Sequence, residues 1–166
     1  MRIVMMTNTY APHVGGVARS VEAFGNEYRR RGHRVLVVCP EFENGPEREL
    51  NVVRVPAMQR FNGSDFSVVL ITPRWLRRKV EAFRPDLIHS HHPFLLGATA
   101  VRLARMLDVP LVFTHHTMYE HYTHYVPGDS ETMRRFATHL STNYSNLSDA
   151  VFAPSEAVAE VLRRAA

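Results

Sequence analysis

The most constraining feature of the sequence is a turn with two consecutive glycines, Gly15 and Gly16, between an apolar run and an amphipathic segment. Residues 2–6 form a short apolar run with β-branched members, which is typical of a strand buried on both faces. After the glycines, apolar side chains recur at helical spacing up to residue 28. Gly32 then follows three arginines, as at a helix C-terminus, and residues 33–40 form a second apolar run. This order predicts a parallel βαβ unit, because parallel strands need a crossover connection.

The same alternation of strand and helix patterns continues to the end of the chain. Further strands are predicted at residues 51–56, 87–89, 109–114 and 149–153, the first of them near a sheet edge because Pro56 ends it. A helix is predicted at 73–84 with Thr72 as N-cap, and another at 94–107 that is apolar enough to be buried on most sides. A long amphipathic helix should begin near Asp129, and Ser155 should cap the last one. The sequence thus predicts a single α/β domain over residues 1–166, a Rossmann-like doubly wound parallel sheet flanked by helices.

Composition indicates a globular protein and excludes several classes. Of 166 residues, 45% are hydrophobic and 22% are charged, which is typical of a globular chain. The single cysteine, Cys39, cannot form an internal disulfide, which favours a reducing cytosol. No signal-peptide core and no apolar run of about 18 residues is present, so we expect a cytoplasmic protein whose membrane contact is peripheral.

Unusual residues follow several of the predicted strands, where ligands bind in doubly wound sheets. These are the Gly15-Gly16 turn, His89-Ser90-His91-His92, Thr114-His115-His116-Thr117 and Pro154-Ser155. The glycine pair has two interpretations. It is a diphosphate-binding loop at a helix N-terminus, where N–H groups are unpaired, or a tight turn that only needs a positive φ. Neither G-x-G-x-x-G nor a Walker loop is present, so the sequence lacks the motifs that usually indicate binding of NAD or ATP.

Seven of the ten histidines lie between His89 and His124. A metal site could be built from members of one set: His91, His92, His116, His121 and His124. However, there is no H-E-x-x-H, no cysteine partner and no obvious carboxylate except Glu120. We therefore expect no metal, and predict polar groups that line a pocket for sugar hydroxyls or phosphate.

These motifs together resemble a known family. The segments Pro12-x-x-Gly15-Gly16-Val17, Gly32-His33-Arg34-Val35, Pro85-Asp86-Leu87-Ile88-His89-Ser90-His91 and Thr114-His115-His116-Thr117 resemble the N-terminal domain of the large retaining GT-B glycosyltransferases of the group-one type. Residues 91–97 and 117–125 are similar to a narrower branch, the diacylglycerol glucosyltransferases of bacterial membranes.

The resemblance implies transfer of a sugar from a UDP- or GDP-sugar to an acceptor hydroxyl, with retention and without a cofactor. The acceptor would be diacylglycerol or another lipid. His116 matches the family histidine beside the transferred sugar and is the predicted catalytic residue. Gly15 and Gly16 would contact the donor diphosphate or lie between donor and acceptor. The predicted acceptor or pocket residues are His13, His91, His92, Thr117, Tyr119 and Glu120.

The family also has a C-terminal nucleotide-sugar domain with an E-x7-E motif, of which nothing is present here. We therefore expect this chain to be the acceptor-side half of a longer protein and to be inactive alone, its own C-terminal domain being a partner. Two alternatives stay open: a GT-B-type nucleotide-sugar epimerase, or a non-catalytic module that binds lipid or nucleotide.

Residues 73–84 form a basic amphipathic segment. Trp75, Leu76, Val80 and Phe83 share one side of the predicted helix. In one interpretation that side packs on the sheet and the cations are solvated. In the other, the basic side and residues 66–71 rest on anionic lipid at the inner face of the cell membrane. The predicted membrane surface is Arg74, Trp75, Arg77, Arg78 and Lys79. Nucleic acid is not an expected partner, because the excess of cations is confined to this one segment and the sequence has no recognised nucleic-acid-binding motif.

Overall fold

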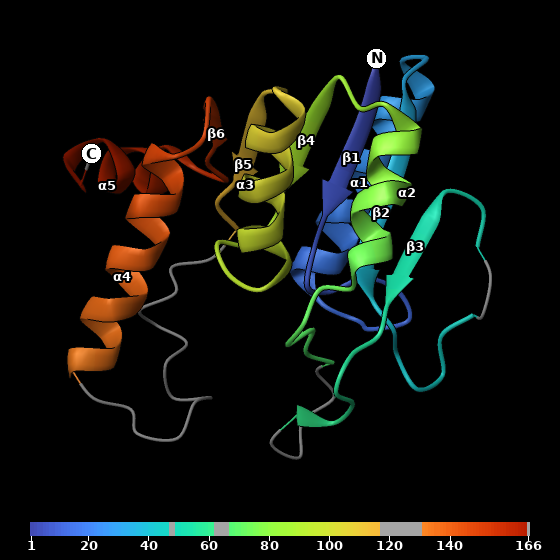
Figure 1. Ribbon diagram of the computed structural model, residues 1–166. Helices are drawn as coiled ribbons and strands as arrows, with labels where there is room; N and C mark the ends of the chain where they lie inside the picture. Colours follow the sequence, from blue (N-terminus) through green and yellow to red (C-terminus); the bar gives the residue numbers. More distant parts are fainter. Residues whose placement is uncertain (47–48, 62–66, 117–130, 166) are drawn as a thin grey trace.

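A six-stranded, all-parallel sheet forms the centre of the molecule, in the order β3-β2-β1-β4-β5-β6 (Figure 1). The computed structural model describes residues 1–46, 49–61, 67–116 and 131–165. The strands are β1 Arg2–Met6, β2 Arg34–Pro40, β3 Val52–Val55, β4 Leu87–Ser90, β5 Leu111–Thr114 and β6 Ala150–Phe152. The predicted doubly wound sheet is confirmed, and β3 is an edge strand as its proline indicated.

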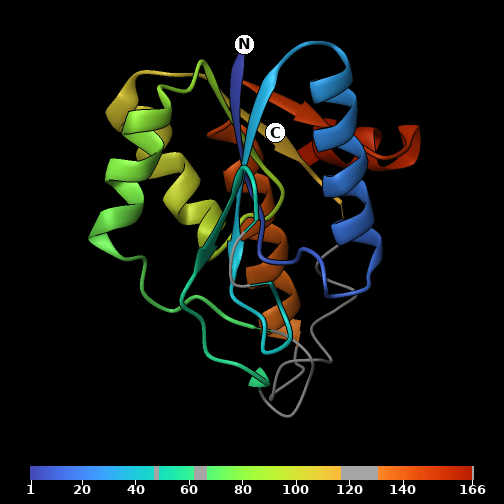
Figure 2. The same cartoon turned by 90° about the vertical axis from the view of Figure 1, so that its right-hand side faces the viewer.

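Helices cover both faces of the sheet. They are α1 Gly16–Arg30, α2 Arg74–Phe83, α3 Leu96–Leu107, α4 Glu131–Asn146 and α5 Glu156–Ala165. Figure 2 shows α1 and α5 on one side of the sheet and α2 and α3 on the other. The start of α4 predicted at Asp129 falls outside the described residues.

The central strand β1 is apolar on both faces, as expected of a strand buried against helices on each side. Ile3 and Met5 of β1 pack with Val21 of α1, whereas Val4 and Met6 lie in the larger cluster with α2, α3 and α4. Cys39, at the end of β2, is buried, and burial raises the pKa of its thiol to about 12. In the described part of the chain, no helix is long and apolar enough to cross a bilayer.

Two helix ends were predicted correctly. Gly32 lies just beyond α1 with a φ of +82°, a conformation that favours glycine. At α5, the Val158 N–H donates to Ser155 Oγ (3.4 Å), as expected of a capping serine.

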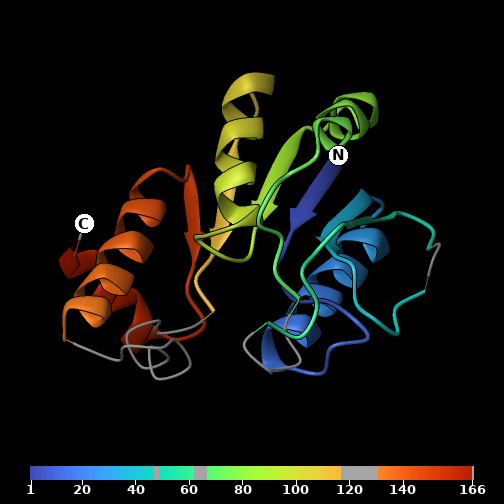
Figure 3. The ribbon, with the colours of Figure 1, turned by 60° about the horizontal axis from the view of Figure 1, so that its bottom comes forward.

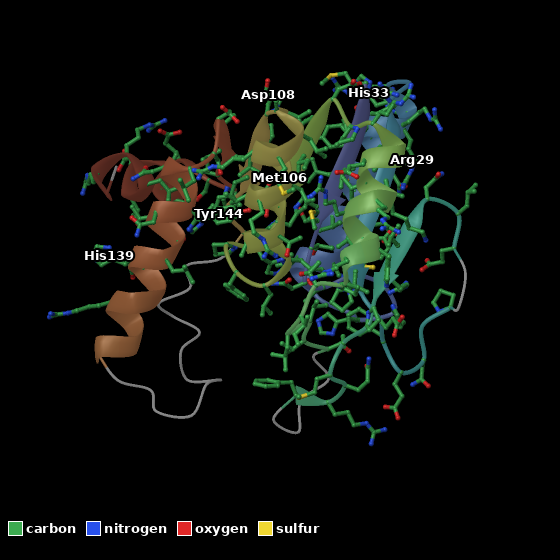
Figure 4. All side chains as sticks on the ribbon, in the orientation of Figure 1. Arg29, His33, Met106, Asp108, His139 and Tyr144 are labelled. Atoms are coloured by element: carbon green, nitrogen blue, oxygen red, sulfur yellow. The ribbon has the colours of Figure 1, made fainter. Side chains whose placement is uncertain are left out.

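Two other helix starts differ from the prediction. Pro73, not Thr72, is the cap residue of α2, and the Thr72 hydroxyl lies 2.8 Å from the Thr99 hydroxyl of α3 instead. Helix α3 begins at Leu96 rather than residue 94, because Leu95 has a φ of 55° and a ψ of −111°, which no helix contains. Nor is α3 buried on most sides: Met106 is 53% exposed (Figure 4), and Arg102 and Arg105 are also exposed.

Candidate functional site

The candidate site lies at the carboxyl ends of the strands, the lower edge in Figure 1. Figure 3, in which this edge comes forward, shows the β1–α1 and β4–α3 connections here. Strand β4 pairs with both β1 and β5, so residues 7–10, 91–95 and 115–116 leave the sheet beside one another. The structure therefore brings the predicted strand-end motifs of β1, β4 and β5 to one edge.

Asn8 ties the first two of these connections together. Its backbone N–H donates to Nδ1 of His92 (3.1 Å), and its side-chain amide donates to the Phe94 carbonyl (3.0 Å). Its Oδ1 accepts the N–H of Leu96 at the start of α3 (3.1 Å). Asn8 thereby satisfies one of the unpaired donors of that helix end. Sequence reasoning missed this residue; its only signal is a polar side chain directly after a buried strand.

His91 and His116 form a pair of hydrogen-bonded imidazoles. Nδ1 of His91 lies 2.9 Å from Nε2 of His116, and the two ring centroids are 5.2 Å apart. His91 is completely buried, whereas His116 is partly exposed, so His116 is the accessible member of the pair. Burial, with the charge of His115 adding to it, lowers the pKa of His116 to about 4. Burial also holds the pKa of His91 well below its usual value, so both rings are neutral at neutral pH.

Two further histidines of the same segment, His89 and His92, are also buried. His89 is buried, with Nε2 2.7 Å from the Thr114 hydroxyl and Nδ1 3.2 Å from the Tyr28 hydroxyl. Its ring centroid lies 4.1 Å from that of His91. Burial, and then the charge of His116, lowers the pKa of both His89 and His92 to about 3. The rings of His89, His91 and His116 thus form a contiguous neutral row, and His92 is a further neutral imidazole at the same sheet edge.

The two glycines of the loop have ordinary backbone conformations, and open space surrounds the second of them. Gly15 has an extended φ of −166°, and among the described glycines only Gly32 has a positive φ. A Cβ built on Gly16 would meet no atom within 4 Å. The interpretation as a turn that only needs a positive φ is therefore wrong. Within the described part of the chain, the cap residue Gly15 makes no side-chain cap hydrogen bond, and no acidic residue lies in the first turn of α1. A helix N-terminus of this kind favours an anion.

Arg54 of β3 holds the loop that precedes the glycines. Its guanidinium donates to the Ala11 carbonyl (2.7 Å) and forms an ion pair with Glu49. It also lies over the rings of Tyr10 and Phe42, at 5.8 and 5.9 Å. The predicted pocket residue His13 stacks on Phe42, with centroids 6.1 Å apart. Sequence reasoning missed Arg54, whose one signal is a charge within a strand.

Helix α4 makes hydrogen bonds to residues beside the site. Ser141 Oγ lies 2.6 Å from His115 Nε2, and the Tyr144 hydroxyl donates to the Gly97 carbonyl (2.9 Å). Figure 4 shows Tyr144 between α4 and α3. These contacts attach α4 to the ends of β5 and α3.

The prediction that the apolar residues of α2 share one side of the helix is wrong for Trp75. Leu76 and Val80 are buried, but Trp75 is 40% exposed, with Lys79 Nζ 5.7 Å from the centroid of its ring. The preceding Leu70 and Ile71 are 61% and 82% exposed. Trp75 therefore belongs to an exposed surface rather than to the buried face.

Some predicted site residues cannot be placed. Thr117, Tyr119 and Glu120 lie outside the described residues, as do His121 and His124. Among the side chains that are described, no three His, Cys, Asp or Glu residues converge as ligands of one metal ion would. The prediction that no metal is bound stays a prediction, because His121 and His124, two of the five histidines considered as ligands, lie outside the described residues.

Comparison with known proteins decides the family. The family model described as Glycosyltransferase Family 4 matches residues 14–166. The chain belongs to this family. It is 29% identical to the alpha-monoglucosyldiacylglycerol synthase of Streptococcus pneumoniae and 34% identical to that of Acholeplasma laidlawii, over 98% and 82% of its length. It is also 29% identical over 98% of its length to a GDP-mannose-dependent alpha-mannosyltransferase of Mycobacterium tuberculosis.

The family 4 chain spans 37%, 34% and 44% of the length of these three relatives. Among solved structures, it resembles S. aureus MnaA in complex with UDP (TM-score 0.57, 16% identity, 98% of this chain and 40% of that one). It also resembles Glycyrrhiza uralensis UGT73P12 (TM-score 0.58, 11% identity, 99% and 46%). These likenesses support the fold. The resemblance to GT-B glycosyltransferases and the diacylglycerol branch is thereby confirmed at the level of the family.

Proposed function

We propose that this family 4 domain is the acceptor-side half of an enzyme that transfers a hexose, with retention, from a UDP- or GDP-sugar to a membrane glycerolipid. The observation that carries the proposal is the uncapped N-terminus of α1 at the glycine pair, on the same sheet edge as His116. The names of the relatives add the chemical classes. Two are diacylglycerol glycoside synthases, and one is a GDP-mannose-dependent mannosyltransferase.

In this proposal, the glycine loop binds the leaving diphosphate. Backbone N–H groups and the partial positive charge of a helix N-terminus stabilise the negative charge that develops as the glycosidic bond breaks. Glycine at position 16 lets phosphate oxygens approach the backbone, since a Cβ there would occupy otherwise open space. His116, neutral and partly exposed, is the side chain beside the transferred sugar.

The lipid acceptor would be reached from a membrane that α2 contacts. The proposed membrane surface comprises Arg74, Trp75, Arg77, Arg78 and Lys79 together with the exposed Leu70 and Ile71. Exposed apolar side chains beside cations suit the headgroup region of an anionic bilayer, where each cation contributes about 1 kcal/mol. Arg77 also pairs with Glu81 (2.5 Å), so the other cations carry most of this attraction. The location would be the cytoplasmic face of the cell membrane.

The test is an assay of the full-length gene product with diacylglycerol in mixed micelles and a panel of UDP- and GDP-hexoses. We expect radiolabelled sugar in the lipid phase, and a steep fall in transfer in His116→Ala. Ala98→Ser, at an exposed position of α3, is the matched control and should keep wild-type transfer. A folded full-length protein that transfers no sugar to lipid would contradict the proposal. Conversion of a UDP-sugar to its epimer without acceptor would identify the alternative epimerase.

A further inference from the structure

The hydrogen bond between His91 and His116 admits two arrangements. With Nδ1 of His91 2.9 Å from Nε2 of His116, one nitrogen carries the proton and the other accepts it. If His116 donates, neutral His91 carries its own proton on Nε2. If His91 donates, its Nε2 is a bare acceptor, and neutral His116 carries its proton on Nδ1.

The surroundings of His91 distinguish the two arrangements. Its Nε2 is buried and has no hydrogen-bond partner among the described residues. The ring is enclosed by the rings of His89, at 4.1 Å between centroids, and Phe24, at 5.9 Å. A buried N–H without an acceptor is rarer in proteins than a buried acceptor that lacks a donor. The arrangement in which His91 carries its proton on Nδ1 and donates to His116 is therefore favoured.

We propose that His91 is a positioning residue that fixes the tautomer of His116, so that His116 presents an Nδ1–H donor to the bound sugar. The proposal rests on the proposed function for the identity of the sugar. Within the described part of the chain, the side-chain contacts of His116 to other polar groups use Nε2 alone, which leaves Nδ1 for a ligand. The proposed donor suits a hydroxyl or ring oxygen, which accepts a hydrogen bond.

The same contact disfavours a charged His116. A second proton on Nε2 of His116 would face the Nδ1–H of His91 at 2.9 Å, two donors with no acceptor between them. The His89 ring stabilises this arrangement from behind, because its own nitrogens are engaged by Thr114 and Tyr28 and its position limits rotation of His91. His91 thereby keeps His116 a neutral donor of fixed direction.

The first test reads the tautomer directly in the full-length protein, by ¹⁵N-histidine NMR at neutral pH. We expect the Nε2 shift of wild-type His116 to be that of an unprotonated nitrogen and Nδ1 to be protonated. His91→Leu removes the donor and should move the His116 proton toward Nε2, the position that free imidazole prefers. His91→Asn places an amide N–H where Nδ1 lies and should restore the wild-type pattern. A wild-type His116 with its proton on Nε2, or a tautomer unchanged in His91→Leu, would overturn the proposal.

The second test is kinetic. We expect His91→Leu to lower kcat about 10- to 100-fold, by analogy with the loss of the hydrogen-bond partner that orients a metal-binding imidazole. The KM for the sugar donor should change little, and His91→Asn should recover most of the kcat. Val80→Ala, a buried truncation in α2, controls for loss of stability and should keep kcat. An unchanged kcat in a folded His91→Leu would overturn the positioning role.

Failure of the proposed function gives a different pattern. If the wild-type protein transfers no sugar, kcat cannot be measured for any variant. The wild-type NMR spectrum still reports which nitrogen of His116 is protonated. If His91→Leu does not fold, the wild-type spectrum and His91→Asn still decide the tautomer.

Discussion

At the scale of single residues, the site depends on small side chains where backbone segments approach closely. Gly97 lies in the first turn of α3, and a Cβ built on it would be 1.8 Å from the His92 carbonyl oxygen. That carbonyl accepts the Ser90 hydroxyl (3.0 Å), so it is fixed in place. Gly97 therefore joins α3 to the histidine segment in a way that no larger residue allows.

Gly97→Ala should destabilise the domain by about 3 kcal/mol or more. This is the upper range for overpacking, because backbone rather than a flexible side chain must move. Ala98→Gly, at the next and exposed position, should lose only about 1 kcal/mol of helix propensity. Urea unfolding of the two variants measures the difference. Equal losses would show that the approach of residues 92 and 97 is not tight.

Gly16→Ala should separate a folding role from a binding role of the glycine loop. The position has open space and no positive φ, so the free energy of unfolding should stay within about 0.5 kcal/mol of wild type. The KM for the sugar donor should rise in the full-length enzyme, because the added Cβ lies where phosphate oxygens would approach. The control for the fold is urea unfolding of the same variant. A normal KM would remove the glycine loop from the proposed donor site.

At the scale of elements, α2 has one buried face and one exposed face. Leu76 and Val80 face the core, whereas Trp75 and Lys79 lie together on the outside. The two interpretations of this helix are therefore compatible, because one face packs in the core and another is exposed, as the proposed contact with lipid requires.

Replacement of both Leu70 and Ile71 by serine should weaken binding of the full-length protein to anionic vesicles without loss of stability. Both side chains are largely exposed, so folding buries little of their surface, whereas lipid would bury it. Co-sedimentation at low and high salt measures the binding. Leu76→Ala is the contrasting variant: its side chain is fully buried, and its loss should cost about 2–5 kcal/mol of stability. Undiminished sedimentation of the double variant would exclude this surface as the membrane contact.

At the scale of the whole molecule, buried neutral histidines link stability to pH. The folded-state pKa values of His89 and His92 are about 3 and that of His116 about 4, all below the ordinary value of 6.5. Between these values the unfolded chain binds protons that the folded chain does not. Their contribution is therefore fully present above pH 6.5 and is lost as the pH falls to about 4 for His116 and about 3 for His89 and His92.

The free energy of unfolding should fall between pH 6.5 and 4.5, by up to about 1.4 kcal/mol per pH unit for each such histidine. Carboxylates titrate mainly below this window. Urea unfolding at several pH values measures the slope. His92→Asn, which can still accept the Asn8 N–H, should make the slope shallower. A flat profile across this window would mean that the histidines are as accessible in the folded as in the unfolded chain.

The sequence by itself determined the architecture and the family. Apolar runs, helical periodicity and glycines at element ends are local patterns, so the six strands, the edge position of β3 and the helix after Gly15 could be read from neighbouring residues. The strand-end rule also placed the histidine motifs at one edge. Helix starts were less certain, as Thr72 and Leu95 show, because they depend on a neighbouring helix and on backbone dihedrals.

Only the tertiary structure decided which side chains meet. His91 and His116 are 25 residues apart in the chain, Asn8 and His92 are 84 apart, and Ala11 and Arg54 are 43 apart. Such contacts depend on the order and register of the parallel strands, which bring distant segments together. No local pattern specifies the side-chain rotations that make a hydrogen bond. The protonation pattern of the histidines therefore belongs to the fold, because burial and ring-to-ring contacts arise only when the sheet is assembled.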